Sequence, residues 1–114
     1  MSQQLENRFY KFAEDVRDWC LLIKWNVINA EYIKQIIRSS ASVGANYIEA
    51  SDSLGLADEK MKLKISRRES KETVHWLKLI LTDNNIQLNQ QRLLLIDEAE
   101  QINKILSAIL NKLR

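Results

Sequence analysis

The stretch Leu5–Ile23, LENRFYKFAEDVRDWCLLI, contains no glycine or proline and spaces its bulky apolar residues at alternating steps of four and three. On an α-helix this spacing brings the apolar residues to one side as a single stripe. The stripe consists of Leu5, Phe9, Phe12, Val16, Trp19 and Ile23. The sequence therefore predicts an amphipathic helix at about residues 5–24.

Two further segments carry helical apolar patterns. The segment at about residues 89–113 repeats the same rhythm with Leu95, Ala99, Ile102, Leu106, Ile109 and Leu113. The segment at about residues 30–50 follows Asn29, which is a good N-cap candidate. Its apolar residues cover nearly half of the helix circumference and are Ile33, Ile36, Ile37, Ala41, Val43, Gly44, Tyr47 and Ile48. Because glycine costs about 1 kcal/mol relative to alanine inside a helix, we expect another backbone to approach closely at Gly44.

The segment at about residues 56–82 differs, because its apolar residues form two stripes on nearly opposite sides of a helix. One stripe consists of Leu63, Val74, Leu77 and Leu81, and the other of Met61, Ile65, Trp76 and Leu79. A helix that is apolar on two sides is normally buried on two sides. We therefore expect one stripe to face the core and the other a second subunit, although the pattern does not tell which is which. A broad core face with scattered surface apolar residues is the alternative.

Composition limits the fold and the location. The chain has 114 residues, no proline, two glycines and one cysteine, and its turn-like clusters lie only near residues 24–29, 51–55 and 83–89. The four segments and their short connections predict one domain over residues 1–114, an all-α, antiparallel up-down four-helix bundle. No window approaches the roughly 18 apolar residues of a membrane-spanning helix, and no signal peptide opens the chain. With a single cysteine there is no internal disulfide, so we expect a cytoplasmic protein without a membrane partner.

Cations follow one another along the segment 56–82 and define what we call the basic ridge: Lys60, Lys64, Arg67, Lys71 and Lys78. On a helical wheel they lie within about 60° of one another, and no acidic residue falls inside that sector. The ridge is about 27 Å long, from a separation of 18 residues at about 1.5 Å each. It is long enough to follow several backbone phosphates. The alternative is an ordinary solvated face whose lysines pair with acids on neighbouring helices.

A second set of residues could meet where segments 30–50 and 56–82 pack together. It consists of Arg38, Asn46, Glu49, Met61, Ile65, Arg68, Glu69, Glu72 and Trp76. We expect this set to form a polar cluster or a subunit interface, in which Arg38 or Arg68 pairs with one of the three glutamates. Such a pair can fix the register of two helices and the choice of partner. Simple solvent exposure is the alternative.

The sequence nominates no catalytic site. Glu72 and His75 have the Glu-x-x-His spacing of di-metal bundles, but those sites need two such motifs and two further glutamates, and this chain has one histidine. Glycine-rich phosphate-binding motifs and the G-x-S-x-G nucleophile motif are absent. Cys20 lies beside Trp19 on the apolar side of its helix and is interpreted as a core residue rather than a nucleophile. We therefore expect a protein that is not an enzyme and that needs neither a metal nor a cofactor.

Two motifs resemble a known family. Residues 36–50, IIRSSASVGANYIEA, resemble the second-helix signature of the four-helix bundle proteins encoded by intervening sequences of bacterial 23S rRNA genes. Residues 69–77, ESKETVHWL, are similar to the third-helix signature of that family. The resemblance extends over essentially the whole chain. Gly55 departs from it, since relatives often have a serine N-cap there, but glycine is a tolerated cap.

The resemblance implies a homo-oligomeric ring, typically of five subunits. It also relates the chain to the accessory variability proteins of diversity-generating retroelements, which bind nucleic acid and a reverse transcriptase through a basic surface of the ring. For most other members no activity is established. The resulting hypothesis is a pentameric bundle that associates with RNA or DNA through the basic ridge. The alternative hypothesis is a structural or protein-binding scaffold ring with no nucleic-acid role.

Overall fold

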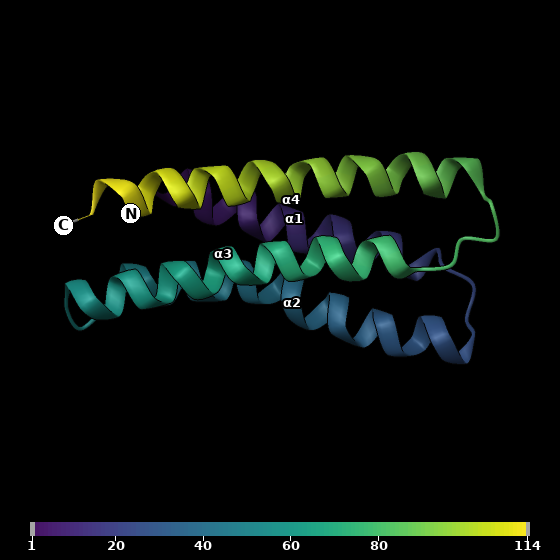
Figure 1. Ribbon diagram of the computed structural model, residues 1–114, viewed down its shortest axis with the longest axis horizontal. Helices are drawn as coiled ribbons and strands as arrows, with labels where there is room; N and C mark the ends of the chain where they lie inside the picture. The colour runs from purple at the N-terminus through teal and green to yellow at the C-terminus, as the bar shows by residue number, and fades with distance from the viewer. Residues whose placement is uncertain (1, 114) are drawn as a thin grey trace.

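The computed structural model describes residues 2–113, and within them it contains four α-helices and no strand. The helices are α1 (Gln3–Leu21), α2 (Val27–Ser51), α3 (Leu56–Leu79) and α4 (Ile86–Lys112). Figure 1 shows them lying along the long axis of the molecule, with both ends of the chain at the same end. The predicted all-α fold with four helices is confirmed, and the observed helix ends differ from the predicted ones by at most three residues.

Short polar side chains begin three of the helices. Ser2, Asn26 and Asn85 are the N-caps of α1, α2 and α4, and each accepts a hydrogen bond from the backbone N–H three residues further on. This is the usual way to satisfy a free N–H in the first turn of a helix. The prediction that Asn29 caps the second helix is therefore wrong. The cap is Asn26, and the helix already begins at Val27.

Asn29 has a different role because its side chain is completely buried. Its Nδ2 donates to the carbonyl oxygen of Leu81 at 2.9 Å, and the Leu81 N–H donates to its Oδ1 at 2.9 Å. Nearby, Arg92 of α4 donates from Nη1 to the carbonyl oxygens of Leu77 (3.1 Å) and Ile80 (2.6 Å). These contacts satisfy carbonyl groups at the end of α3. The helix thus ends at Leu79 rather than at the predicted residue 82.

The two glycines lie where a side chain would interfere. Gly55, the N-cap of α3, has a φ of +146°, which side chains of L-residues rarely adopt. At Gly44 an added Cβ would lie 3.4 Å from Phe9 Cβ and within 4.0 Å of backbone atoms of Phe9 and Tyr10. The close approach expected at Gly44 is confirmed, and the approaching backbone is that of α1.

The core lies along the predicted stripes of α1 and α4, whose members are all buried or packed against it. In α3, Leu63 and Leu77 are buried and Val74 packs against them, so this stripe faces the core. Leu81 follows the helix and is exposed. In α2 the predicted apolar face divides, because Ile37 and Ile48 are exposed while the other large residues turn inward. The core face of α3 also contains three buried hydroxyl residues, Ser66, Ser70 and Thr73.

Each helix packs against two others, in the cyclic order α1–α2–α3–α4, and the α2–α3 contact is the most extensive. Small side chains at this contact allow the two helices to approach closely. In the described part of the chain, none of the helices combines the length and the apolarity that crossing a membrane requires.

Candidate nucleic-acid interface

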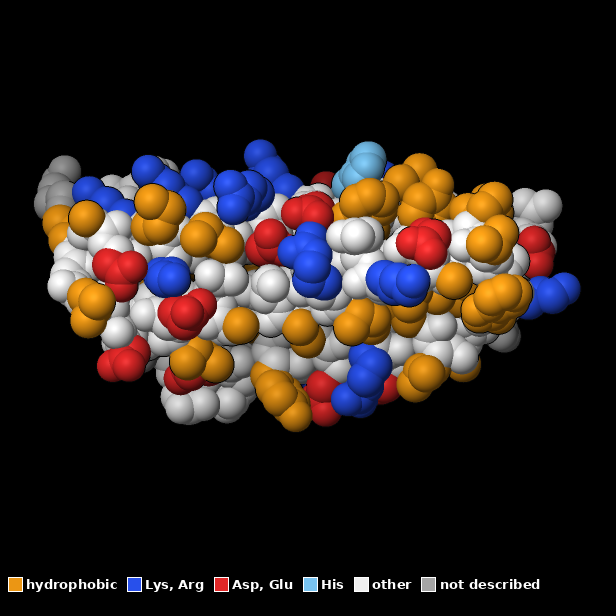
Figure 2. Space-filling model, turned by 90° about the horizontal axis from the view of Figure 1, so that it is seen from below, with side chains coloured by type: hydrophobic (Ala, Val, Ile, Leu, Met, Phe, Trp, Pro, Cys, Tyr) orange, Lys and Arg blue, Asp and Glu red, His pale blue; other side chains and the backbone are white. Residues whose placement is uncertain are grey.

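The basic ridge lies on the side of α3 that faces away from the core. Lys64, Lys71 and Lys78 are exposed, and Lys60 and Arg67 are half-buried. Figure 2 shows Lys and Arg side chains gathered along one edge of the molecule, next to the pale-blue His75. Leu63 and Leu77 are buried in the core. Their burial fixes the rotation of α3 about its own axis, so that the ridge residues face outward.

The ridge cations are not neutralised by the fold. Within residues 2–113, none of the five forms an ion pair with a carboxylate. The side chain of Arg67 makes one hydrogen bond, from Nη1 to Ser107 Oγ of α4 at 3.3 Å. The pairing of these cations with acids on neighbouring helices is not observed within residues 2–113, and an ordinary solvated face stays the alternative interpretation.

The exposed side of α3 carries two polar residues that the predicted ridge does not include. Arg68 and His75 are exposed on the same side of the helix. Both lie within about 80° of Lys60 on a helical wheel, so they fall just outside the sector of about 60° that defines the ridge. On α4, Lys104 and Glu100 line the same shallow groove as Lys71, so the surface at the α3–α4 contact carries charges of both signs.

A shallow hollow of about 440 Å³ lies in this basic surface, on the exposed side of α3. Its lining consists of Met61, Lys64, Ile65, Arg67, Arg68 and Lys71. No carboxylate belongs to this lining; we call its two apolar side chains, Met61 and Ile65, the floor and its four cations the rim.

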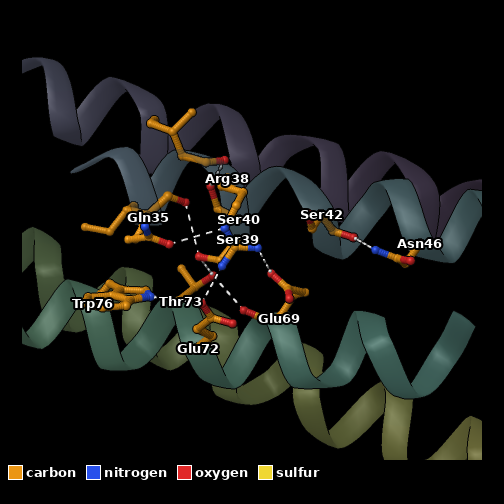
Figure 3. A network of polar contacts seen from close by, with 12 residues as sticks. Gln35, Arg38, Ser39, Ser40, Ser42, Asn46, Glu69, Glu72, Thr73 and Trp76 are labelled. Atoms are coloured by element: carbon orange, nitrogen blue, oxygen red, sulfur yellow. Dashed lines mark hydrogen bonds and ion pairs between the residues drawn. The ribbon is translucent and has the colours of Figure 1, made fainter. Parts of the chain in front are cut away.

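The predicted polar cluster forms between α2 and α3, as Figure 3 shows. Arg38 of α2 donates from Nη1 to Glu69 Oε2 at 3.0 Å, and from Nη2 to Glu72. Glu72 also accepts a hydrogen bond from Trp76 Nε1 at 3.2 Å. The side chain of Glu69 is only 9% exposed, so its charge depends on Arg38 for compensation. Arg38 is therefore the arginine that pairs with the glutamates.

The other members of the predicted cluster have separate contacts. Glu49 pairs with Lys62 at 3.6 Å, and Asn46 donates to the carbonyl oxygen of Ser42 within α2. Arg68 points to the ridge side and has no ion pair or hydrogen bond in the described part of the chain, so its predicted alternative pairing with a glutamate is wrong. Glu72 lies four residues from Arg68, about 40° away on a helical wheel, but its carboxylate is bound by Arg38 and Trp76.

Buried hydroxyl groups complete the contact between α2 and α3. Ser39 Oγ and Thr73 Oγ1 lie 2.8 Å apart, and Thr73 Oγ1 also donates to the carbonyl oxygen of Glu69 at 2.8 Å. Ser66 Oγ donates to the carbonyl oxygen of Val43 at 2.7 Å. Sequence reasoning missed Ser66 and Thr73 because it followed apolar periodicity. The available signals were that Ser66 and Thr73 are seven residues apart and that both lie between Leu63 and Leu77 in the sequence.

The second apolar stripe of α3 is only partly exposed. Met61 and Leu79 are exposed, but Ile65 is half-buried and Trp76 packs against the core, with its ring 6.0 Å from that of Tyr32. Its assignment as a subunit interface stays a prediction. Exposed apolar side chains also lie on α2 and α1, at Ile37, Ile48 and Tyr10.

Cys20, Glu72 and His75, whose side chains could in principle act as nucleophile or metal ligands, make structural contacts. Cys20 is buried in the core as predicted, and burial raises the pKa of its thiol to about 12, so the reactive thiolate is disfavoured. Glu72 is bound by Arg38 and Trp76, as described above. The ring of His75 lies edge-on to Trp76 with 5.0 Å between the ring centroids.

Comparisons with known proteins agree with the fold. A family model described as 23S rRNA-intervening sequence protein matches residues 4–108. The chain is also similar to a crystal structure from Bacteroides thetaiotaomicron, described as a protein with unknown function from the S23 ribosomal protein family. The two chains are 32% identical with a TM-score of 0.75, over 92% of this chain and 96% of the other. A search of curated proteins finds no match.

Proposed function

Since the chain belongs to the 23S rRNA-intervening sequence protein family, we propose that it is a non-enzymatic, homo-oligomeric bundle that binds RNA or another nucleic acid through the basic ridge of α3. The observation that carries this proposal is the absence of carboxylate partners for the five ridge cations within residues 2–113. Cations that the fold leaves unpaired remain free to replace the counterions of a phosphate backbone.

The arrangement of the ridge suits a phosphate backbone. The cations from Lys60 to Lys71 lie about one helical turn apart, and Lys78 follows two turns after Lys71; a turn of α-helix rises about 5.4 Å. Lys60 and Lys64, and likewise Arg67 and Lys71, are four residues apart, a spacing at which like charges destabilise a helix. A row of repelling cations along an exposed face is favourable for binding a polyanion and unfavourable for the isolated helix.

The assembly belongs to the same proposal. We propose antiparallel, up-down helices within each subunit and a ring of subunits in the cytoplasm, most simply five, as the family resemblance implies. The exposed apolar residues Tyr10, Ile37 and Ile48, on α1 and α2, support self-association, because apolar surface of this kind is often covered by another chain. A ring would repeat the ridge on every subunit, so that weak contacts act together.

The decisive experiment compares the wild type with the triple variant Lys64→Glu/Arg67→Glu/Lys71→Glu on structured RNA and on duplex DNA, at two salt concentrations. With about four phosphate contacts on a single strand, the slope of log K against log salt should be about −3 for each subunit engaged. The triple variant should lose most of its binding but keep its helicity and its mass by light scattering. The expected mass is a multiple of 13.4 kDa.

A matched control is Lys11→Glu/Lys24→Glu/Lys34→Glu, which changes the net charge by the same amount on exposed positions away from α3. This variant should retain most of the binding. Equal loss in both variants would mean that net charge, not the ridge, is responsible. Absence of wild-type binding at low salt would contradict the proposal and favour the scaffold hypothesis.

A further inference from the structure

The hollow beside the ridge has an apolar floor that a phosphate backbone alone would not use. Met61 is 57% exposed and lies in the lining with the half-buried Ile65. The volume of the hollow, about 440 Å³, falls within the range of about 300–1,000 Å³ that is usual for sites that hold small ligands. An exposed methionine at such a position offers a flexible, polarisable surface for a flat ligand.

The rim of the hollow is positive on several sides. Lys64, Arg67 and Lys71 belong to the ridge, and Arg68, which the sequence grouped with Met61 and Ile65 as a polar cluster or subunit interface, adds a fourth cation. Since Arg68 has no hydrogen bond or ion pair among residues 2–113, its planar guanidinium is available for stacking. A ligand that fits both rim and floor carries negative charge next to an aromatic or heteroaromatic plane.

A nucleotide with an exposed base has this combination. We propose that the hollow seats one unpaired nucleobase of a bound strand, stacked on Met61 and the Arg68 guanidinium, while neighbouring phosphates contact Lys64, Arg67 and Lys71. The inference rests on the proposed nucleic-acid function and narrows it to single-stranded or looped nucleic acid. In a duplex the bases are paired and stacked, so their faces do not reach a protein surface.

The chemistry of the lining also limits what can be recognised. The floor presents no amide, hydroxyl or carboxylate that could read the hydrogen-bonding edge of a base. Stacking without edge contacts tolerates every base, since each has a flat face. The hollow therefore selects for an unpaired base but not for its identity.

The test uses the full-length protein and a fluorescently labelled 12-nucleotide RNA of mixed sequence, either single-stranded or annealed to its complement, at one salt concentration. The wild type should bind the single strand at least about fivefold more tightly than the duplex. Met61→Ala should weaken single-strand binding about three- to tenfold and leave duplex binding unchanged. Arg68→Lys, which retains the charge but not the planar group, should weaken it about two- to fivefold without changing the salt slope.

Leu93→Ala is the matched control, because Leu93 is an exposed apolar residue of α4 that lies outside the hollow and outside both apolar stripes of α3. It should leave both affinities unchanged. If the wild type prefers the duplex, or if Met61→Ala and Arg68→Lys weaken both forms equally, the hollow does not hold a base, while binding through the ridge still stands. If neither form binds at low salt, the proposed function fails and this inference fails with it.

Discussion

Arg38 and Arg68 lie on neighbouring helices of the same bundle, yet their surroundings are opposite. Arg38 is at the contact between α2 and α3, where it pairs with Glu69 and Glu72. Arg68 is on the exposed side of α3, beside cations that have no carboxylate partner in the described part of the chain. One region neutralises its charges within the fold, and the other leaves them unneutralised.

This difference separates two uses of charge. At the α2–α3 contact the buried Glu69 needs its arginine, so the pair holds two helices in register. On the ridge, neighbouring cations repel one another and contribute nothing to holding the helices together. Charges that stabilise the fold and charges available to a ligand can thus be distinguished by whether the fold supplies their partners.

The largest expected effect on stability is at Arg38. Arg38→Ala should lower the free energy of unfolding by about 2–3 kcal/mol, because Glu69 would keep a buried charge without a partner. The estimate is below that for a fully buried pair since the Arg38 side chain is 48% exposed. Urea denaturation measures the change, and Arg68→Ala is the control, with an expected change within about 0.5 kcal/mol. Similar losses of stability in both variants would mean that the pairing of Arg38 within the fold does not set it apart from Arg68.

A smaller effect is expected at the buried hydroxyl pair. Thr73→Val should cost about 1 kcal/mol, since the buried Ser39 hydroxyl would lose its bond of 2.8 Å to Thr73 and keep only the long one of 3.4 Å to the carbonyl oxygen of Ile36. The double variant Ser39→Ala/Thr73→Val should recover part of that loss, because it removes both polar groups together. The same denaturation measurement applies. If Thr73→Val leaves the free energy of unfolding unchanged, the α2–α3 contact tolerates the loss of the hydrogen bond between Ser39 and Thr73.

The smallest effect has the opposite sign. Lys64→Gln should raise the free energy of unfolding by about 0.3–1 kcal/mol at low salt, because it removes the repulsion with Lys60, Arg67 and Arg68. The gain should shrink in about 1 M salt, where the Debye length is only about 3 Å. Lys62→Gln is the control, since Lys62 is paired with Glu49 and should gain nothing. A loss of stability in Lys64→Gln would mean that the ridge lysine has a structural role.

Apolar periodicity predicted the helices and most of the core, and it failed where polar groups are buried. In α3 the core face includes Ser66 and Thr73, whose hydroxyl groups bond to backbone carbonyl oxygens. Asn29 was interpreted as a cap because asparagine favours that position, but Asn26 has the same preference and begins the helix. Only the packing of the connection between α3 and α4 against Asn29 distinguishes the two.

The candidate site was predictable as far as it depends on one helix. The ridge follows from the wheel positions of its residues, and the polar cluster from the complementary charges of two segments. Sequence could not decide between Arg38 and Arg68, because that choice depends on which side of α3 contacts α2. The hollow was not foreseen at all, since it depends on which side chains of α3 remain uncovered after the helices pack.

The buried side chain of Asn29 also has a consequence for how the protein unfolds. It joins the connection between α3 and α4 to the start of α2 across 52 residues of sequence. The pair α1–α2 and the pair α3–α4 are therefore tied at the loop end as well as along the α2–α3 contact, so we expect the two pairs to unfold together. The Leu81 amide, although outside every helix, exchanges its hydrogen with solvent only when this end of the bundle opens.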